Sequence, residues 1–386
     1  MPPRDPLSLE SITELTAELV RIPSVNPTVA PEEAGDESAI ARFACDWLEA
    51  RGVRAWTEDA APGRPNAVAE VAGGDGPTLV LCAHLDTVGT AGMTIPPFEP
   101  RVDGDRLYGR GGYDMKGGAA AAMSVAAALA GQAFRGRLML ALVADEEYAS
   151  IGASAFVRSH GADGCIVTEP SALRLVLAHK GFVWAKITTR GRAAHGSRWD
   201  LGTSAIATMG HVIAALDTFD RDVLRQRRHA LVGPASMHPA LVQGGAGRST
   251  YAPECRLEVE RRTLPGETPE SVLAELEALV APLAPDAAVE LTLARSPLSC
   301  DPDSPLARGV RRAARNVMGR SAEEIGVGFW MDAAIFEAAG IPTVNFGGDG
   351  EGAHEAVEWV SLGSLVTCAR VLERSVREFI QEHARG

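Results

Sequence analysis

The stretch 79-LVLCAHLDTVG-89 decides the fold, because an apolar strand runs directly into ionisable residues. Such near-continuous apolar strands are typical of parallel sheets that helices cover on both faces. A strand that only filled a core would not need two ionisable groups at the point where it leaves the sheet. His84 and Asp86 therefore require either a polar partner or a metal ion.

Comparable apolar runs recur along the chain, and helical patterns separate them. The runs are NAVAEV at 66–71, RLMLALVA at 137–144, GCIVTE at 164–169 and IPTVNF at 341–346. This alternation predicts an α/β fold built on a mainly parallel sheet. In open sheets of this kind, ligands bind at the carboxyl ends of the strands, where several of these runs meet polar residues.

Two further segments predict helices that pack on this sheet. Apolar residues recur at helical spacing from Leu9 to Leu19, and Ser11 with Glu14 forms a candidate capping box at a slightly later start. Residues 117–131 are uncharged and mostly small. Because this run is shorter than the roughly 20 residues that span a bilayer, it predicts a tightly packed core helix.

The rhythm of the sequence changes between residues 180 and 295, where the predicted order is β-α-β-β-α-β, the ferredoxin-like pattern. A chain of 386 residues is also too long for one ordinary core. We therefore expect a catalytic domain made of residues 1–179 and 296–386, with residues 180–295 inserted as a second domain.

Composition excludes several classes of protein. The net charge of -13, from 50 acidic and 37 basic residues, disfavours nucleic acid and anionic membrane as partners. The six cysteines are scattered without a CxxC pair, and the N-terminal segment resembles neither a secretory signal nor a transit peptide. A cytoplasmic location is the expectation.

Most of the candidate chemistry lies just after predicted strands. The residues concerned are two histidines and five acids: His84, Asp86, Asp114, Glu146, Glu147, Glu169 and His354. Each alone has a plainer explanation, such as a solvated turn acid, a hydrogen-bonded histidine or a weak phosphate loop. Gathered on one rim, they would repel one another unless cations were present. Zinc, cobalt and manganese accept this set of nitrogen and oxygen ligands.

The motifs, taken in order, resemble a known family. They are HLDTV, GRGxxDMKGG, DEE, TEP, AHGS, RRTLPGE and GAHE, and they cover nearly the whole chain. The chain is similar to the dinuclear zinc deacylases and exopeptidases that include acetylornithine deacetylase, succinyl-diaminopimelate desuccinylase, aminoacylases and glutamate carboxypeptidases. The resemblance implies a zinc-hydrolase catalytic domain with an inserted lid and dimerisation domain.

The resemblance also implies two divalent metal ions per chain, zinc first, with cobalt or manganese as substitutes. His84 and Glu169 would hold one ion, Glu147 and His354 the other, and Asp114 would bridge them.

Four more residues receive roles from the resemblance. Asp86 would fix the tautomer and orientation of its histidine neighbour, and Glu146 would be the general base. His195 would stabilise the intermediate, often across a dimer, and Arg262 would bind a substrate carboxylate. A loop histidine without function and an ion pair of Arg262 with an acidic neighbour are the competing interpretations of the last two.

The implied activity is hydrolysis of the amide bond of N-acyl amino acids by a metal-bridged hydroxide, as in acetylornithine deacetylase. Desuccinylase, dipeptidase and carboxypeptidase activities stay open, with a short peptide as the other substrate class. The chain departs from the family at Thr250, where many members have asparagine, and at Ala334, where desuccinylase-like members have arginine. Trp199 and Trp330 offer either apolar substrate contact or core packing.

Two other classes of protein compete with the enzyme. A metal-binding homologue without catalysis would have no need for Glu146, so its presence favours the enzyme. A nucleotide-binding protein is excluded, because the glycine loops lack both a Walker lysine and a dinucleotide fingerprint.

Overall fold

The computed structural model describes residues 4–33 and 35–383, which form two compact units. Unit 1 contains the described residues up to Leu177, together with Cys300–Ile325 and the residues from Met331 onward. Unit 2 contains Ala178–Ser299 and Gly326–Trp330.

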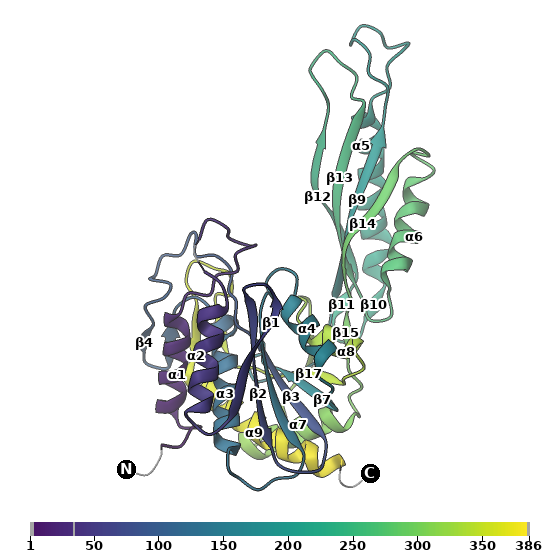
Figure 1. Ribbon diagram of the computed structural model, residues 1–386. Helices are drawn as coiled ribbons and strands as arrows, with labels where there is room; N and C mark the ends of the chain where they lie inside the picture. Colours follow the sequence, from purple (N-terminus) through teal and green to yellow (C-terminus); the bar gives the residue numbers. More distant parts are fainter. Residues whose placement is uncertain (1–3, 34, 384–386) are drawn as a thin grey trace. The chain divides into compact units, whose positions relative to one another are not determined.

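Unit 1 is built on a large sheet whose strands lie in the order β1-β2-β6-β3-β7-β17-β8. Figure 1 labels β1, β2, β3, β7 and β17 of this sheet. The central strands β6, β3, β7 and β17 run parallel, whereas β1, β2 and β8 pair antiparallel at the two sides. The bounds are β1 Arg54–Ala61, β2 Arg64–Ala72, β3 Thr78–His84, β6 Arg137–Val143, β7 Gly164–Val167, β8 Leu175–His179 and β17 Thr343–Asn345. The α/β fold is confirmed, and the four parallel strands are those predicted to end in polar residues.

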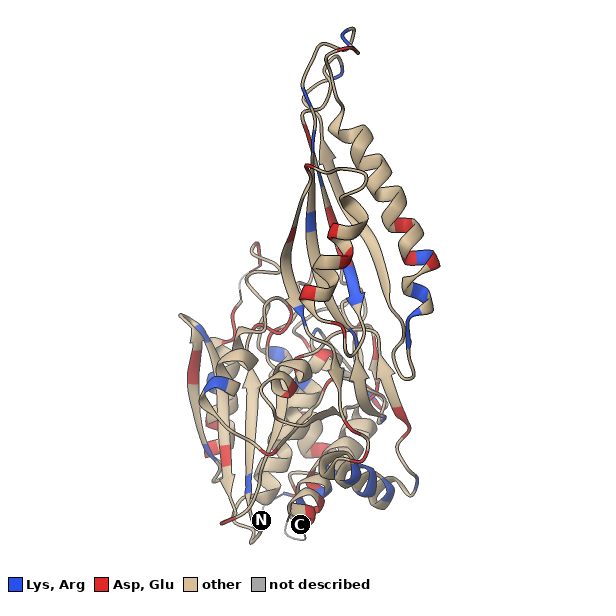
Figure 2. Cartoon of the chain, turned by 90° about the vertical axis from the view of Figure 1, so that its right-hand side faces the viewer, with Lys and Arg blue, Asp and Glu red and all other residues tan. Residues whose placement is uncertain are grey.

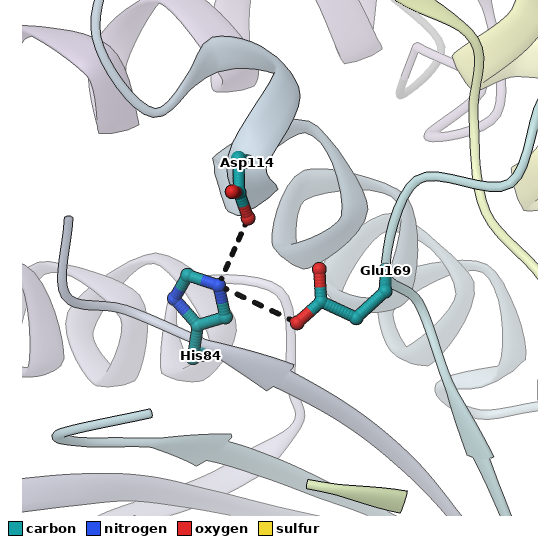
Figure 3. A group of neighbouring side chains, drawn as sticks. All are labelled: His84, Asp114 and Glu169. Atoms are coloured by element: carbon teal, nitrogen blue, oxygen red, sulfur yellow. Dashed lines mark hydrogen bonds and ion pairs between the residues drawn. The ribbon is translucent and has the colours of Figure 1, made fainter. Parts of the chain in front are cut away.

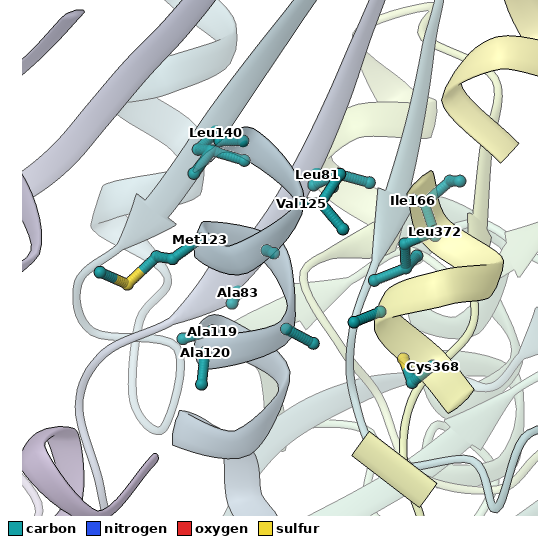
Figure 4. Packing of buried hydrophobic residues seen from close by; sticks show 14 of the residues in the cluster. Leu81, Ala83, Ala119, Ala120, Met123, Val125, Leu140, Ile166, Cys368 and Leu372 are labelled. Carbon is teal, nitrogen blue, oxygen red and sulfur yellow. The ribbon is translucent and has the colours of Figure 1, made fainter. Parts of the chain in front are cut away.

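Alternate residues of the buried strands pack on opposite faces of this sheet. Leu79, Leu81 and Ala83 of β3 belong to one core cluster with α3 and α9, whereas the equally buried Val80 and Cys82 lie outside that cluster. Figure 4 shows Leu81 and Ala83 near side chains of α3 and α9. Helices α2 and α3 contact one face of the sheet, and α4 and α8 contact strands from the other. The bounds are α2 Ser38–Glu49, α3 Gly117–Leu129, α4 Ile151–Ser159, α7 Pro305–Met318, α8 Ala333–Ala338 and α9 Leu362–His383.

The small-residue helix α3 is buried along almost its whole length, as predicted. Its small side chains let the backbone approach the strands closely, so a methyl group added at Gly118 would press on the carbonyl oxygen of Thr168. Thr168 directly precedes Glu169, so this close approach helps to place the end of β7.

The start of the first helix differs from the prediction. Helix α1 spans Leu9–Arg21, and its N-cap is Ser8, whose hydroxyl accepts a hydrogen bond from the backbone N–H of Ser11. The predicted capping box with Glu14 is therefore wrong. Glu14 instead pairs with Arg4 on the exposed side of the helix.

A small four-stranded sheet that was not predicted joins two distant segments of unit 1. Its order is β18-β19-β5-β4, with bounds β4 Arg101–Asp103, β5 Arg106–Tyr108, β18 Gly350–Glu351 and β19 Trp359–Ser361. Strand β5 leads into the segment η1, Gly112–Lys116, whose backbone leaves helical geometry at Asp114 and Met115. The β18–β19 hairpin carries His354, so the pairing of β19 with β5 brings the segments that contain Asp114 and His354 together.

Unit 2 has the predicted β-α-β-β-α-β order. Its four-stranded antiparallel sheet runs β12-β13-β9-β14, and α5 and α6 pack on it. The bounds are β9 Gly181–Arg190, α5 Ala205–Asp222, β12 Ser236–Gly244, β13 Glu254–Thr263, α6 Pro269–Val280 and β14 Ala288–Arg295, with the short elements η2 Leu224–Gln226, β10 Arg228–His229 and β11 Gly233–Pro234 between α5 and β12. This confirms the ferredoxin-like pattern.

One segment lies with a different unit from the one expected. Gly326–Trp330 falls within the predicted range 296–386 of the catalytic domain, but its contacts place it in unit 2. The backbone N–H of Lys180 donates to the carbonyl of Val327, and the Trp330 ring packs edge-on against Phe182. Strands β8 and β16, Glu324–Val327, cross the boundary between the units, and β15, Leu298–Ser299, pairs antiparallel with β8.

Charges are interspersed along the chain, as Figure 2 shows. Arginines of α7 are held in ion pairs, for example Arg312 with Glu378 and Arg308 with Glu382. The six cysteines are unpaired and buried. Among the described residues, no helix combines the length and the apolar character needed to cross a membrane.

We predict that Gly118→Ala lowers the thermal unfolding midpoint, because its methyl group would lie 2.8 Å from Thr168 Oγ1. Overpacking of this kind costs about 1 to 3 kcal/mol. Gly210→Ala in α5 is the matched control, since no atom lies within 4 Å of its new methyl group. The control should leave the midpoint unchanged or raise it, and equal midpoints for the two variants would contradict the assigned packing of α3.

Candidate metal centre

The predicted metal ligands all lie in unit 1 and converge from separate elements. His84 is the last residue of β3, Glu147 follows β6, and Glu169 follows β7. Asp114 lies in η1, and His354 lies between β18 and β19. Because β3, β6 and β7 are parallel neighbours, their carboxyl ends meet at one edge of the sheet.

Three of these side chains form a first cluster (Figure 3). The Nε2 atom of His84 lies 3.2 Å from Asp114 Oδ1 and 3.5 Å from Glu169 Oε1. The His84 side chain is 1% exposed, so its ring cannot exchange these partners for water.

A second cluster uses the other oxygen of the same aspartate. His354 Nε2 lies 3.2 Å from Asp114 Oδ2 and 3.1 Å from Glu147 Oε2. In both clusters, the candidate ligand atoms all lie within 4.8 Å of one another. The structure thus brings together the five predicted ligands as two groups that share Asp114.

Crowding of charge shifts the titration of these groups. Burial opposes a charge on His84, yet Glu169 and Asp114 raise the pKa of its imidazole well above the usual value. Hydrogen bonds to Asp114 and Glu147 raise the pKa of His354 to about 10. Burial would raise the pKa of Asp114 too, but the two histidines lower it.

The pKa values of the three glutamates are raised, in contrast to the lowered pKa of Asp114. Burial is the largest cause that raises the pKa of Glu146, Glu147 and Glu169, and neighbouring carboxylates add to it. Several acids in one desolvated place are stable as anions only beside positive charge.

The donor set fits divalent cations. Each cluster offers one imidazole nitrogen and two carboxylate groups, which are ligands that zinc, cobalt and manganese accept. Two divalent ions would carry four positive charges against the three negative charges of Asp114, Glu147 and Glu169. Such ions would offset the burial and the repulsion that together raise the pKa values of the glutamates.

Asp86 contacts its histidine differently from the expectation. The carbonyl oxygen of Asp86 lies 2.9 Å from His84 Nδ1, whereas its carboxylate lies 3.7 Å away. The carboxylate instead accepts hydrogen bonds from the backbone N–H groups of Glu146 and Glu147 and from Asn26. Asp86 therefore orients the ring through its backbone and holds the Glu146–Glu147 turn through its side chain.

Three residues that the sequence interpretation missed support the same turn. Asp145 has a left-handed backbone with φ of 68°, which is uncommon for a residue other than glycine. Its carboxylate accepts hydrogen bonds from Arg64, at 2.9 Å, and from Asn26, at 3.0 Å. Asp145 is the first residue of the DEE motif, whereas Arg64 and Asn26 lie in none of the motifs named above.

Glu146 stands apart from both ligand clusters. It follows β6 directly after Asp145, and its backbone N–H donates to Asp86 Oδ1 at 3.1 Å. It directly precedes the predicted ligand Glu147, and burial together with the nearby charges of Glu169, His84 and Glu147 shifts the pKa of its carboxyl.

His195 and Arg262 belong to unit 2, whereas the ligand clusters belong to unit 1. His195 is exposed, and its Nδ1 lies 2.8 Å from the hydroxyl of Ser197. Its backbone forms an isolated bridge with Thr250. Arg262 makes two hydrogen bonds with Glu260, at 2.8 and 3.2 Å, which is the competing interpretation of that arginine.

The tryptophans and Ala334 also receive definite places. Trp199 is 79% exposed, so core packing does not explain it. Trp330 packs against Phe182 in unit 2, whereas Ala334 is buried in α8 of unit 1.

Comparisons with known proteins agree with this geometry. Residues 80–378 match the model of the Peptidase family M20/M25/M40. The acetylornithine deacetylase of Myxococcus xanthus is 32% identical over 349 residues, which cover 86% of this chain and 90% of that protein. The acetylornithine deacetylase of Edwardsiella ictaluri is 28% identical and covers 97% of this chain and 99% of its own length.

Solved structures share the fold. Aminopeptidase PepT from Bacillus cereus has a TM-score of 0.81 at 20% identity, covering 97% of this chain and 99% of its own. The YXEP protein of Bacillus subtilis, a dinuclear metal binding peptidase, has a TM-score of 0.75 at 16% identity, covering 97% and 98%. With the family model spanning more than half of its length, this chain belongs to peptidase family M20/M25/M40.

Proposed function

We propose that this protein is a metal-dependent amidohydrolase that removes the acyl group from N-acyl amino acids. Members of a peptidase family hydrolyse amide bonds, and the curated relatives quoted above are acetylornithine deacetylases. The observation that carries the proposal is the pair of ligand clusters that share Asp114, with Glu146 beside them and outside both.

The site would hold two divalent ions, zinc first, with cobalt or manganese as substitutes. His84 and Glu169 would bind one ion, Glu147 and His354 the other, and Asp114 both. When bound, the ions would polarise the substrate carbonyl and make water a stronger nucleophile.

The residues of the chain would do the rest of the chemistry. Glu146 would take the proton of the attacking water on its carboxylate and pass it to the departing amine. Asp86 would keep Glu146 and Glu147 in place through their backbone N–H groups.

Recognition of the substrate would involve Arg262, whose guanidinium suits a carboxylate. In the structure this group is paired with Glu260 and lies 5.2 Å from the centre of the Phe182 ring. A substrate carboxylate would therefore have to compete with Glu260, which favours a substrate that carries one well-placed carboxylate.

We also propose a homodimer that forms through unit 2. Strand β12 is an edge strand of its sheet, and Leu241 and Val242 on it are 58% and 57% exposed. Open edges with apolar side chains are suited to pairing with another chain.

Glu146→Gln and Asp114→Ala should separate proton transfer from metal binding. We expect Glu146→Gln to keep both ions and to lose about 10²- to 10⁴-fold in turnover, the usual contribution of general acid–base catalysis. Asp114→Ala should lose both ions and all activity, because one carboxylate serves both clusters. Elemental analysis and kcat measurements distinguish the two, and full metal content in Asp114→Ala would refute the shared site.

The acyl group should be small or apolar. Ala334 offers no charge where desuccinylase-like sequences have arginine, so an N-succinyl substrate would bury an extra carboxylate with no partner from this position. Losing one charge-assisted hydrogen bond costs about 1.5 to 3 kcal/mol, or roughly ten- to a hundredfold in kcat/KM. Comparing N-acetyl, N-succinyl and dipeptide forms of the same amino acid tests this, and a preference for succinyl would return the desuccinylase assignment.

The role of His195 across a dimer can be tested by mixing subunits. His195→Ala and Glu146→Gln homodimers should each be inactive. Subunit exchange between them should restore activity, because some sites of the mixed dimer would have both groups intact. If exchange is verified and activity does not return, His195 acts within its own chain or not at all.

A further inference from the structure

A buried ion pair, Arg110–Glu358, contacts the segments that carry the predicted ligands and has no role in the chemistry described so far. The Arg110 side chain is 2% exposed and that of Glu358 is 0% exposed. The two residues are 248 positions apart in the sequence. We infer that this pair is a positioning unit that sets the ligand loops of both cation clusters, an inference that rests on the two-cation site proposed above.

Glu358 receives four hydrogen bonds, all from the segment that ends in the shared ligand. Its Oε2 accepts from Arg110 Nη1, at 2.7 Å, and from the N–H of Gly111, at 3.0 Å. Its Oε1 accepts from the N–H groups of Tyr113 and Asp114, both at 3.0 Å. One carboxylate therefore fixes the backbone on both sides of the turn that presents Asp114.

Arg110 extends the same unit to two more ligand segments. Its Nε donates to the carbonyl of Gly89, at 3.2 Å, in the loop that leaves β3 after His84. Its Nη2 donates to the carbonyl of Glu355, at 3.3 Å, next to His354. The pair thus joins three chain segments, and these carry a ligand of the first cluster, a ligand of the second cluster and the shared one.

Neither side chain supplies a ligand atom to either cluster. Any effect of the pair on metal binding must therefore pass through the backbone of these loops. Because Asp114 serves both clusters, a shift of its turn should weaken both ions together. A change at Glu169 or Glu147 would instead act on one cluster directly.

Glu358→Gln tests the inference in the full-length protein. The amide has the same size but turns an NH₂ group toward donors, so at least part of the four-bond set is lost. We expect the affinities for both zinc ions to fall about ten- to a hundredfold, the usual cost of losing a residue that orients ligands. Competition with a chelator measures each affinity, and the unfolding midpoint of the metal-free protein is recorded beside it.

Glu267→Gln is the matched control in unit 2. Glu267 also pairs with a buried arginine, Arg261 at 2.6 Å, and accepts a backbone N–H from Leu264 at 2.8 Å. This control should lower the unfolding midpoint without changing metal affinity. If Glu358→Gln likewise lowers the unfolding midpoint without changing metal affinity, the pair has only a structural role and the inference is overturned.

Arg110→Lys provides a second test of the inference if Glu358→Gln does not fold. Lysine retains the charge but lacks the planar fork, so it cannot hold Glu358, Gly89 and Glu355 at once. It should weaken both ions in the same direction, and the double variant should be no worse than the more severe single one, because the two residues act as a unit. Loss of one ion only would contradict the inference, whereas a wild-type protein that binds fewer than two ions would contradict the proposed function itself.

Discussion

The sharing of one carboxylate between two clusters is the constraint on which the rest of unit 1 depends. Asp114 offers Oδ1 to His84 and Oδ2 to His354, so both histidines must approach it from opposite sides within hydrogen-bond distance. A carboxylate can be held in this way only if its backbone is fixed, and the hydrogen bond that the Asp114 N–H donates to Glu358 provides that support. The arrangement concentrates negative charge that divalent cations would balance.

The fold meets this constraint with two sheets that have different tasks. The parallel strands of the large sheet place His84, Glu147 and Glu169 along one edge, because their ends are neighbours in register. The small sheet made by β5 and β19 delivers the other two ligands from segments far apart in the chain. Neither sheet alone could complete both clusters.

Hydrogen bonds between polar side chains fix the positions of the loops that carry the predicted ligands. Asp86 joins the β3 end to the turn after β6, and Arg64 with Asn26 holds Asp145 in its left-handed conformation. The buried groups are tied by hydrogen bonds that would be costly to leave unpaired. The proposed function would therefore depend also on residues that are neither predicted ligands nor the predicted base.

The sequence by itself determined the strands that end in ligands, the residue types of both clusters and the β-α-β-β-α-β order of unit 2, because these follow from local periodicity and from motifs. Tertiary structure alone decided that the Asp86 carboxylate holds the Glu146–Glu147 turn, that Gly326–Trp330 lies with unit 2 and that Arg110 pairs with Glu358. The reason is physical: each of these contacts is chosen by competition among many donors and acceptors that meet only when distant segments pack together, and no local pattern records which partner is the nearest.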